Sequence, residues 1–454
     1  MTPDSADFYP AMSHPPAHPS LMAATAWLGG VRLAPDHEWK ILEIGCASGH
    51  HILPIAETYP QARITAIDVD ADAIAEAQRL ARLADLGNIE FLCADLSTWQ
   101  APAQHYDLII AHGVFSWVDD RTKSALLSLC HRALKTQGVA MISYNTQPGW
   151  ALRQPLREMT LALGASLPSA EQALGWMETS LAGRDDNYAR HLLEIIQDTR
   201  AKGDQQLKFD DLAPINDPCY FSQFIHWCEQ AGLTYVGETD STLANTQLLG
   251  SAAQQSLRAL QGQPLLMEQM ADFLTGRTFR CSLIARRDVV RSMPSAEEWS
   301  ALCVESLMPI PDTGHAVTDA LASAIAAAEP DCLPLAELLE KSPRLALADV
   351  IPVIIRLLQL GMIHLRLSPV RIAAEMPSHP RLSALNLDHL AQGKPVVDAY
   401  HRPCRLSAND RNWLRLCDGT ISFEQLIKAC RDEKQAHALH ELLAHLHQRG
   451  LFIG

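Results

Sequence analysis

The amino-acid sequence predicts an α/β protein with a parallel, doubly wound sheet, followed by a mainly helical C-terminal region. Between residues 40 and 144, short apolar runs alternate with segments of helical periodicity, as in successive βα units. The first run leads into a loop with two glycines, and the second ends in an acid. Beyond Pro294 the alternation stops. At 454 residues the chain is too long for one compact core, so we expect two or three domains.

The strands of the first part are short apolar runs, each bounded by a helical segment or a loop. They are expected at residues 41–44, 64–68, 89–93, 106–111 and 138–144. Between them, an alanine-rich amphipathic helix at 71–86 stops at Gly87-Asn88, and a further helix is expected at 124–134. Strands that alternate with helices in this way form a parallel sheet.

The sheet is expected to be completed only after an interruption. Residues 145 to about 209 have an irregular or helical pattern, whereas the patterns that follow predict helix, strand, helix and strand at 220–231, 233–236, 251–274 and 278–286. We therefore expect the α/β domain to comprise residues 31–150 and 220–290. Residues 151–219 would be a helical insertion that caps the carboxyl edge of the sheet and shapes what enters there.

Residues 1–30 form an N-terminal segment with two interpretations. Residues 1–20 are rich in proline and polar residues and are not expected to form a core element, whereas helical periodicity runs from Leu21 to Leu28. The segment is expected either to fray or, with its aromatic pair Phe8-Tyr9, to order as a lid over a ligand.

The C-terminal domain, residues 295–454, contains an internal similarity. Residues 353–363 parallel residues 442–452, and a short helical piece precedes each, at 335–340 and 423–428. A leucine-rich helix, a glycine stop and a short apolar strand suggest a winged-helix-like unit, present once or twice. DNA binding by such a unit requires a basic recognition helix, and the first of these helices carries a single arginine. Packing or protein contact is therefore favoured.

The glycine loop at residues 45–49 is the strongest functional signal. Gly45 and Gly49 allow close approach to a ligand, and Asp68, at the tip of the next strand, can accept hydrogen bonds from two ribose hydroxyls. The dinucleotide fingerprint would require a third glycine. Glu43, two residues before the loop, would repel a pyrophosphate but suits a ligand with an ammonium and a sulfonium. An ordinary α/β turn without a ligand is the alternative.

This stretch resembles motif I of the class I S-adenosylmethionine-dependent methyltransferases, which have a Rossmann-like, seven-stranded sheet. Nearly the whole chain resembles the bacterial members that carry a methyltransferase regulatory domain, including the rickettsial outer-membrane-protein lysine methyltransferases. The resemblance rests on Tyr9-Pro10, His18-Pro19, EIGCASG at 43–49, AHGVFSWV at 111–118, YNTQPGW at 144–150, NDPCYF at 216–221, FLTGRTFR at 273–280 and CDGT at 417–420. One departure is FDDL at 209–212, where such proteins have a histidine and an aromatic residue beside the aspartate.

The resemblance implies S-adenosylmethionine as cofactor, with S-adenosylhomocysteine as product, and protein lysine as methyl acceptor. The expected cofactor residues are Glu43, Gly45, Gly49, Asp68, Asp95, Leu96 and His112. Asp95 follows the third strand, at the edge where open α/β sheets bind ligands, and the resemblance implies that it accepts from the adenine amino group.

Aromatic residues follow the fourth and fifth strands, where an acceptor channel would lie. Trp117 and Tyr144, and also Phe115 and Trp150, are candidates for its lining, with core packing as the alternative. Such a channel would desolvate a lysine amine and attract cations. His112 would act as a base or would position the cofactor through its backbone. The loop after the fourth strand lacks a D/N-P-P-Y sequence, which argues against an adenine or glutamine methyltransferase.

Composition and net charge argue against several other classes of protein function. A net charge of −15 and a pI near 5.6 argue against a general nucleic-acid binder. The eleven cysteines indicate reduced thiols, and the nineteen histidines show no metal-ligand spacing. No apolar stretch reaches the roughly 18 residues of a membrane span and no signal peptide is visible, so a cytoplasmic protein is expected, and a homodimer through the C-terminal region is plausible. The rival functions are a small-molecule methyltransferase and a non-catalytic interaction protein that has kept the fold.

Overall fold

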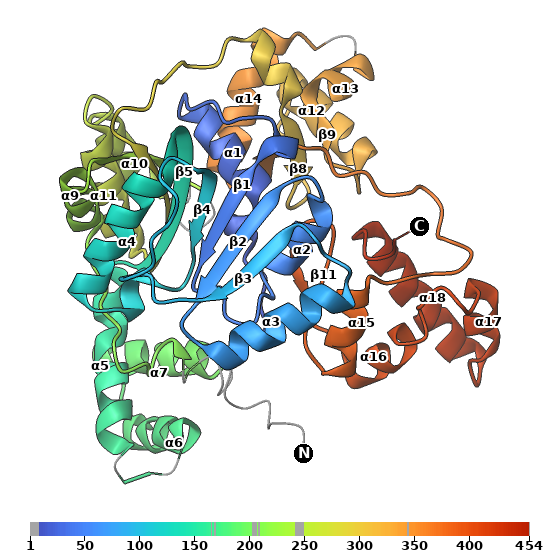
Figure 1. Cartoon of the computed structure of the whole chain (residues 1–454), viewed down its shortest axis with the longest axis horizontal. Coiled ribbons are helices and arrows are strands. Elements are labelled where there is room, and N and C mark those ends of the chain that lie inside the picture. The colour runs from blue at the N-terminus through green and yellow to red at the C-terminus, as the bar shows by residue number, and fades with distance from the viewer. Residues whose placement is uncertain are drawn as a thin grey trace.

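The computed structural model describes residues 9–164, 166–167, 169–201, 207, 209–240, 249–342 and 345–453. Its centre is a seven-stranded sheet in the order β3-β2-β1-β4-β5-β7-β6 (Figure 1), which confirms the predicted class I methyltransferase fold. All neighbouring strands are parallel except β7, which is antiparallel to both β5 and β6. The strands are β1 (Lys40–Ile44), β2 (Arg63–Asp68), β3 (Ile89–Cys93), β4 (Tyr106–Ala111), β5 (Leu134–Asn145), β6 (Leu233–Glu238) and β7 (Phe279–Arg286).

Helices cover both faces of the sheet, because its central strands are apolar on both sides. One face packs against α1 (Pro19–Leu28), α2 (Ile52–Thr58) and α3 (Ala71–Leu83), and the other against α4 (Asp120–Ala133) and α9 (Phe221–Gln230). Beside α9 lie α10 (Ser251–Arg258) and α11 (Pro264–Thr275). Among the described residues of this part there are also three short 3-10 helices: η1 (Pro15–Ala17), η2 (Asp36–Glu38) and η3 (Phe115–Trp117).

The interruption of the α/β domain is helical, with α5 (Gly149–Leu163), α6 (Ala170–Leu181) and α7 (Asn187–Arg200). The three helices start at the carboxyl end of β5 and extend away from the sheet (Figure 1). They enclose a small apolar core of their own, built around Leu174, Met177, Leu192 and Ile196. The chain returns to the sheet edge where the Cys219 N–H donates to the Asn145 carbonyl at 3.2 Å.

The N-terminal segment lies deeper in the protein than predicted. The expectation that residues 1–20 form no core element is wrong for residues 17–20, all of which are buried. Helix α1 begins at Pro19, because proline fits the first helical turn and His18 Nδ1 accepts a hydrogen bond from Ser20 N at 3.2 Å. The helix packs on the sheet through Met22 and Ala26, and on the C-terminal region through Ala24 and Trp27. Phe8 of the predicted lid lies outside the described residues.

The C-terminal region folds into two units, each with its own apolar core. The first contains η6 (Glu297–Ala301), β8 (Cys303–Ser306), α12 (Ala316–Ala328), β9 (Leu333–Pro334), α13 (Leu335–Glu340), α14 (Leu347–Gln359) and β10 (Ile363–Arg366). The second contains α15 (Ala384–Ala391), β11 (Val396–Val397), β12 (Pro403–Cys404), α16 (Ala408–Leu414), α17 (Phe423–Lys428) and α18 (Glu433–Gln448).

The predicted internal repeat is only partly present. Both units have a short helix followed by a longer one, and β10 follows the first pair and joins β8 in a three-stranded sheet, β10-β8-β9. The prediction of a strand after the second pair is wrong: residues 451–453 are not in a strand, and their backbone N–H groups donate to the Leu446 carbonyl from Leu451 at 3.1 Å and to the Arg381 carbonyl from Ile453 at 2.8 Å. No helix in the described ranges combines the length and apolarity that crossing a bilayer requires.

Candidate cofactor site and acceptor wall

The glycine loop leaves β1 in a conformation that only glycine adopts without strain. Gly45 and Gly49 have φ angles of +74° and +78°. The Gly45 N–H donates to the Ile67 carbonyl at 2.8 Å, which ties the loop to the end of β2. A Cβ atom at Gly45 would lie 2.6 Å from Val114 Cγ2, so the loop is also packed closely beneath β4.

The two predicted acids lie on adjacent loops at the carboxyl edge. Asp68 accepts hydrogen bonds from Ala47 N at 2.8 Å and from Asp70 N at 3.0 Å, so it shapes the glycine loop and keeps acceptor capacity for ribose hydroxyls. The Ala94 N–H donates to the Asp68 carbonyl at 2.8 Å, which places the Asp95 turn beside it. Asp95 is exposed, and hydrogen bonds from Ser97 lower the pKa of its carboxyl. Leu96, next to it, is half-buried.

Glu43 is the penultimate residue of β1 and lies beneath the glycine loop. Its carboxylate is 5% exposed, and Oε2 has no hydrogen-bond partner among the described residues. Burial, and then the nearby Asp68, raise the pKa of Glu43 well above its usual value. Burial of a carboxylate without a hydrogen-bond partner costs free energy, so its presence here points to a cationic ligand group. The ammonium of S-adenosylmethionine fits this requirement.

A small cavity of about 40 Å³ joins the glycine loop to the N-terminal segment. Of the predicted cofactor residues, Glu43, Gly45 and His112 line it, whereas Gly49, Asp68, Asp95 and Leu96 do not. The other lining residues are Tyr9, Pro10, Met12, His14, Cys46, Ala47, Ser48, His50 and His51. Residues of the N-terminal segment therefore lie beside the cofactor loop, and the lid role stays a prediction.

His112 is a poor candidate for a general base. Its ring stacks on that of His14, with centroids 3.7 Å apart. Burial lowers the pKa of His112 well below its usual value, and His14 and His51 lower it further. A neutral imidazole of such low basicity would not retain a proton near neutral pH. The geometry therefore favours the positioning role over the base role.

The acceptor wall, which we define as Tyr9, Trp117, Phe209 and Asp210, adjoins this cavity. Trp117 Nε1 donates to the Asp210 carbonyl at 3.2 Å, and the Tyr9 hydroxyl donates to Asp210 Oδ1 at 3.4 Å. The rings of Tyr9 and Phe209 meet edge to face, with centroids 5.9 Å apart. The Asn216 side chain also donates to the Asp210 carbonyl, at 3.2 Å. Trp117 thus contacts Asp210, which belongs to the FDDL segment noted in the sequence but was given no place in the predicted site.

The prediction that Tyr144 lines the acceptor channel is wrong. Tyr144 is fully buried, stacks on Phe224 with centroids 4.3 Å apart, and its hydroxyl lies 3.0 Å from Ser282 Oγ. Phe115 is fully buried in the same cluster, beneath α4 and α9. Both side chains are core packing, because they point to the face of the sheet opposite the glycine loop. Trp150 is buried at the start of α5.

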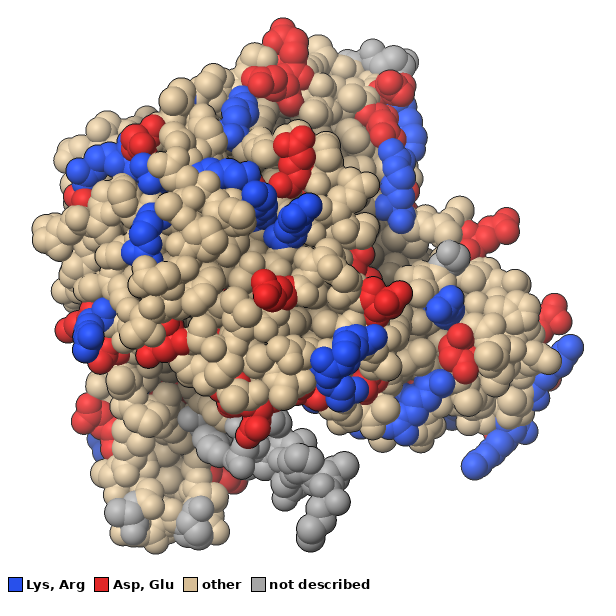
Figure 2. Space-filling view, in the orientation of Figure 1, with Lys and Arg blue, Asp and Glu red and all other residues tan. Residues whose placement is uncertain are grey.

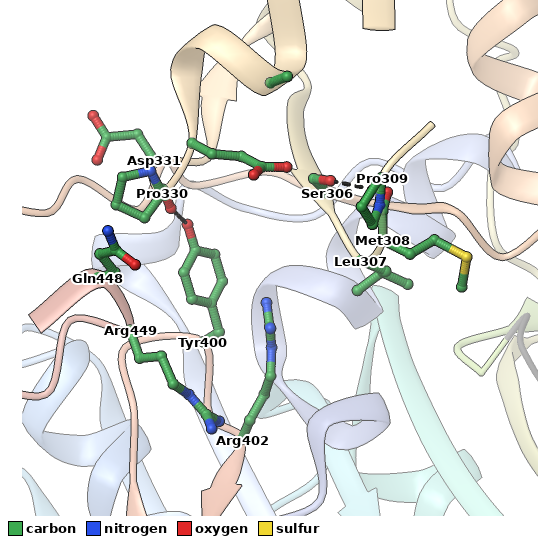
Figure 3. A pocket seen from close by; sticks show the side chains of 12 residues that line it. Ser306, Leu307, Met308, Pro309, Pro330, Asp331, Tyr400, Arg402, Gln448 and Arg449 are labelled. Atoms are coloured by element: carbon green, nitrogen blue, oxygen red, sulfur yellow. Dashed lines mark hydrogen bonds between the residues drawn. The ribbon is translucent and has the colours of Figure 1, made fainter. Parts of the chain in front are cut away.

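A second cavity, of about 480 Å³, lies between the two C-terminal units (Figure 3). The loop after β8, from Ser306 to Pro309, forms one side, and Tyr400, Arg402 and Arg449 form the other. The arginines are paired, Arg402 with Glu305 and Arg449 with Asp398. No group of three metal-ligating side chains occurs within the described ranges. On the face seen in Figure 2, basic and acidic side chains are interspersed.

The fold is that of the class I S-adenosylmethionine-dependent methyltransferases, and the site fits their cofactor. The strand order with antiparallel β7, the glycine loop over an orphaned acid, and the acid at the tip of β2 all belong to that class. Residues 41–138 match the family described as "Methyltransferase domain", and residues 203–286 match the "Predicted methyltransferase regulatory domain". The chain combines these two parts, and S-adenosylmethionine is its cofactor.

Known proteins resemble the chain over different lengths. The structure of PKMT2 from Rickettsia typhi, also determined in complex with AdoHcy, matches 98% of this chain and 100% of that one, with a TM-score of 0.84 and 21% identity. An uncharacterised protein of Rickettsia prowazekii is 30% identical over 294 residues, which are 62% of this chain and 53% of that protein, so the chain spans about half the length of that relative. A malonyl-[acyl-carrier protein] O-methyltransferase of Bacillus anthracis is 26% identical over 46% of this chain and 70% of its own length.

Replacement of Asp68 by alanine is expected to weaken S-adenosylhomocysteine binding by about 10- to 100-fold, since hydrogen bonds to a charged group contribute about 1.5–3 kcal/mol. The loop would also lose its support at Ala47. Isothermal titration calorimetry measures the affinity, and circular dichroism checks the fold. Asp70→Ala is the matched control, because it removes a helix cap without touching the loop. Equal binding by the Asp68 variant and the wild type would refute the ribose assignment.

Proposed function

We propose that the protein transfers the methyl group of S-adenosylmethionine to lysine side chains of proteins. The observation that carries this proposal is the acceptor wall, in which a carboxylate and aromatic rings lie next to the cofactor cavity. Aromatic faces attract sulfonium and ammonium groups, and a carboxylate stabilises an amine while it is still protonated. The motif resemblance to the rickettsial-type lysine methyltransferases supports the same acceptor class, and the similarity of the whole chain to PKMT2 from Rickettsia typhi is consistent with that resemblance.

When bound, the cofactor supplies an electrophilic methyl carbon that a neutral amine takes by in-line displacement. Asp210 would hold the incoming ammonium, and the aromatic residues Tyr9, Trp117 and Phe209 would exclude water from it. Desolvation lowers the pKa of the amine, which favours loss of its proton before attack. Positioning at about 3 Å from the reacting carbon then supplies most of the rate. Glu43, next to the same cavity, would hold the amino-acid end of the cofactor.

The principal alternative is methylation of a small molecule or a biosynthetic intermediate. The match to the malonyl-[acyl-carrier protein] O-methyltransferase favours it, but that match covers less than half of this chain. An acceptor carboxylate would also meet the like charge of Asp210, which disfavours its binding. A non-catalytic interaction protein is a weaker alternative, because Glu43 keeps a buried carboxyl oxygen with no hydrogen-bond partner among the described residues, as a ligand site would.

Transfer of a labelled methyl group to an extract of the source cell tests the proposal. We expect label in the protein fraction and methyl-lysine after acid hydrolysis. The Asp210→Asn variant is expected to lower that transfer about tenfold or more at subsaturating acceptor, since one charge-assisted hydrogen bond is lost. Asp185→Asn, at a fully exposed position of the same insertion, is the control. Label only in the small-molecule fraction would overturn the lysine assignment and leave methyl transfer standing.

A further inference from the structure

Two adjacent histidines directly after the glycine loop contact the C-terminal region. His51 Nδ1 lies 2.7 Å from His401 Nε2, and His50 Nδ1 lies 2.8 Å from His389 Nε2. All four rings are buried. The partners in the first pair are 350 positions apart in the chain. The C-terminal region therefore reaches the residues that follow the cofactor loop.

The surrounding hydrogen bonds determine where the proton of His51 lies. The backbone N–H of His14 donates to His51 Nδ1 at 3.2 Å, so Nδ1 is an acceptor. His401 Nε2, which also faces Nδ1, must then carry a proton and donate it. Burial lowers the pKa of both His51 and His401 well below the usual value, so both rings are neutral. The proton of His51 is therefore on Nε2.

Within the described residues, that N–H group has no hydrogen-bond partner at normal distance, although a backbone contact with Ala17 raises the pKa of His51 against the effect of burial. His51 Nε2 is buried and makes no hydrogen bond within the described part of the chain, and Glu43 Oε2 is in the same situation. His51 Nε2 lies 4.0 Å from Glu43 Oε1, and both residues line the cavity beside the glycine loop. A buried donor next to a buried carboxylate is complementary to an α-amino acid, whose carboxylate and ammonium are equally close together.

We propose that His51 binds the carboxylate of the methionine part of S-adenosylmethionine through Nε2–H, while Glu43 accepts from its ammonium. His401 is the positioning residue: by donating to Nδ1, it holds the His51 proton on the ligand side. The cofactor site is then incomplete without the C-terminal region. This inference goes beyond the proposed function, because it concerns the cofactor and is independent of the methyl acceptor.

The turn that carries His401 is built to hold it in place. His401 has a φ of +64°, which is strained for a residue with a side chain. The Asp398 carboxylate secures the turn, accepting from Tyr400 N at 3.0 Å, from Arg402 N at 2.8 Å and from Arg449 Nε at 2.8 Å. Tyr400 and Arg402 line the cavity in Figure 3, whereas His401 points to the cofactor loop.

His50 provides an internal control, because both of its ring nitrogens already have partners in the protein. His389 Nδ1 donates to the Pro395 carbonyl at 3.0 Å, so His389 Nε2 accepts from His50 Nδ1–H. His50 Nε2 in turn faces the Lys394 ammonium at 3.3 Å. His50 therefore has no N–H group to offer a ligand. Loss of His389 disturbs the same domain contact without altering the donor that faces the cavity.

The test compares two ligands that differ only in the amino-acid end. S-adenosylhomocysteine has it, and 5′-deoxy-5′-methylthioadenosine lacks it. By calorimetry, His401→Phe is expected to weaken binding of the first about tenfold and to leave binding of the second unchanged. His401→Gln, whose side-chain amide can donate, should recover most of the loss. His389→Phe should leave the ratio of the two affinities as in the wild type.

Either of two results would overturn the proposal: equal affinities for S-adenosylhomocysteine in His401→Phe and wild type, or an equal loss for both ligands in a folded variant. If His401→Phe fails to fold, the imidazole nitrogens of His51 in the wild type decide the matter by ¹⁵N NMR. A proton on Nε2 supports the assignment, and a proton on Nδ1 refutes it. Neither the calorimetric affinities nor the His51 tautomer depends on the methyl acceptor, so failure of the lysine assignment would leave both unaffected.

Discussion

S-adenosylhomocysteine is expected to bind Glu43→Gln protein about 10- to 100-fold more weakly than wild type, because the ammonium loses a charged acceptor in a buried site. Without ligand, the same variant should be the more stable protein above neutral pH. The raised pKa of Glu43 means that its contribution to stability is complete at low pH and is lost as the pH rises through that pKa. The glutamine side chain is neutral at every pH and avoids this loss.

Calorimetry and thermal unfolding between pH 5 and pH 8 measure the two effects. The difference in Tm between variant and wild type should be smallest at pH 5 and should grow towards pH 8. Saturating S-adenosylhomocysteine should reverse the order of the two proteins, since a ligand stabilises the protein that binds it. Glu90→Gln, at an exposed position on β3, is the control. A variant that is less stable than wild type at pH 8 would contradict the assignment of an orphaned carboxylate.

Glu305→Gln is expected to destabilise the protein by about 3 kcal/mol at pH 7. Glu305 is 2% exposed and accepts from Arg366 Nε at 2.6 Å. Burial alone would raise the pKa of Glu305, but Arg366, together with His364 and Arg402, outweighs it and holds the pKa at about 2. The stability that this carboxylate contributes is therefore present above its usual pKa of about 4.5 and is lost as the pH falls towards 2.

Urea unfolding at several pH values tests this expectation. Variant and wild type should differ most at pH 6–7 and converge near pH 2, where both side chains are neutral. Glu337→Gln is the matched control: its ion pair with Arg371 lies at the surface, where such pairs contribute about 0–1 kcal/mol. Equal stability of the Glu305 and Glu337 variants would contradict the expected contribution of the buried Glu305–Arg366 ion pair between β8 and β10.

The sheet could be predicted from the sequence because its signals are local. Apolar runs with helical spacers identified β1 to β5, and the glycine loop with Glu43 and Asp68 identified the cofactor edge. The face of the sheet to which Tyr144 points also follows from the sequence, because side chains alternate between the two faces along a strand. Ala140 and Ile142 pack beneath α4 and α9, so alternation assigns Tyr144 to the same face.

The histidine contacts could not be predicted, because a hydrogen bond between distant residues leaves no pattern in the local sequence. The contact between His51 and His401 could be predicted only if the fold of the C-terminal region were already known. The second repeat was over-predicted for a related reason. Residues 451–453 have the composition of a strand, but a strand needs a neighbour to pair with, and β10 finds one in β8.

The segment matched as a regulatory domain, residues 203–286, supplies β6 and β7 of the central sheet. It also contains Phe209 and Asp210 of the acceptor wall, together with a buried ion cluster in which Arg280 contacts Glu238 and Asp272. The segment is therefore structurally part of the methyltransferase domain. Any regulation through this segment would act directly on Phe209 and Asp210, which we propose to face the acceptor.

The burial of α1 between the sheet and the C-terminal region has a consequence for synthesis on the ribosome. Ser20 Oγ accepts from the backbone N–H groups of Leu367 and Ser368, both at 3.0 Å, so this segment has to wait for partners that are made almost 350 residues later. Contacts of such sequence separation form late in folding. A chain that stopped before those partners were translated would leave Ser20 without these two hydrogen bonds.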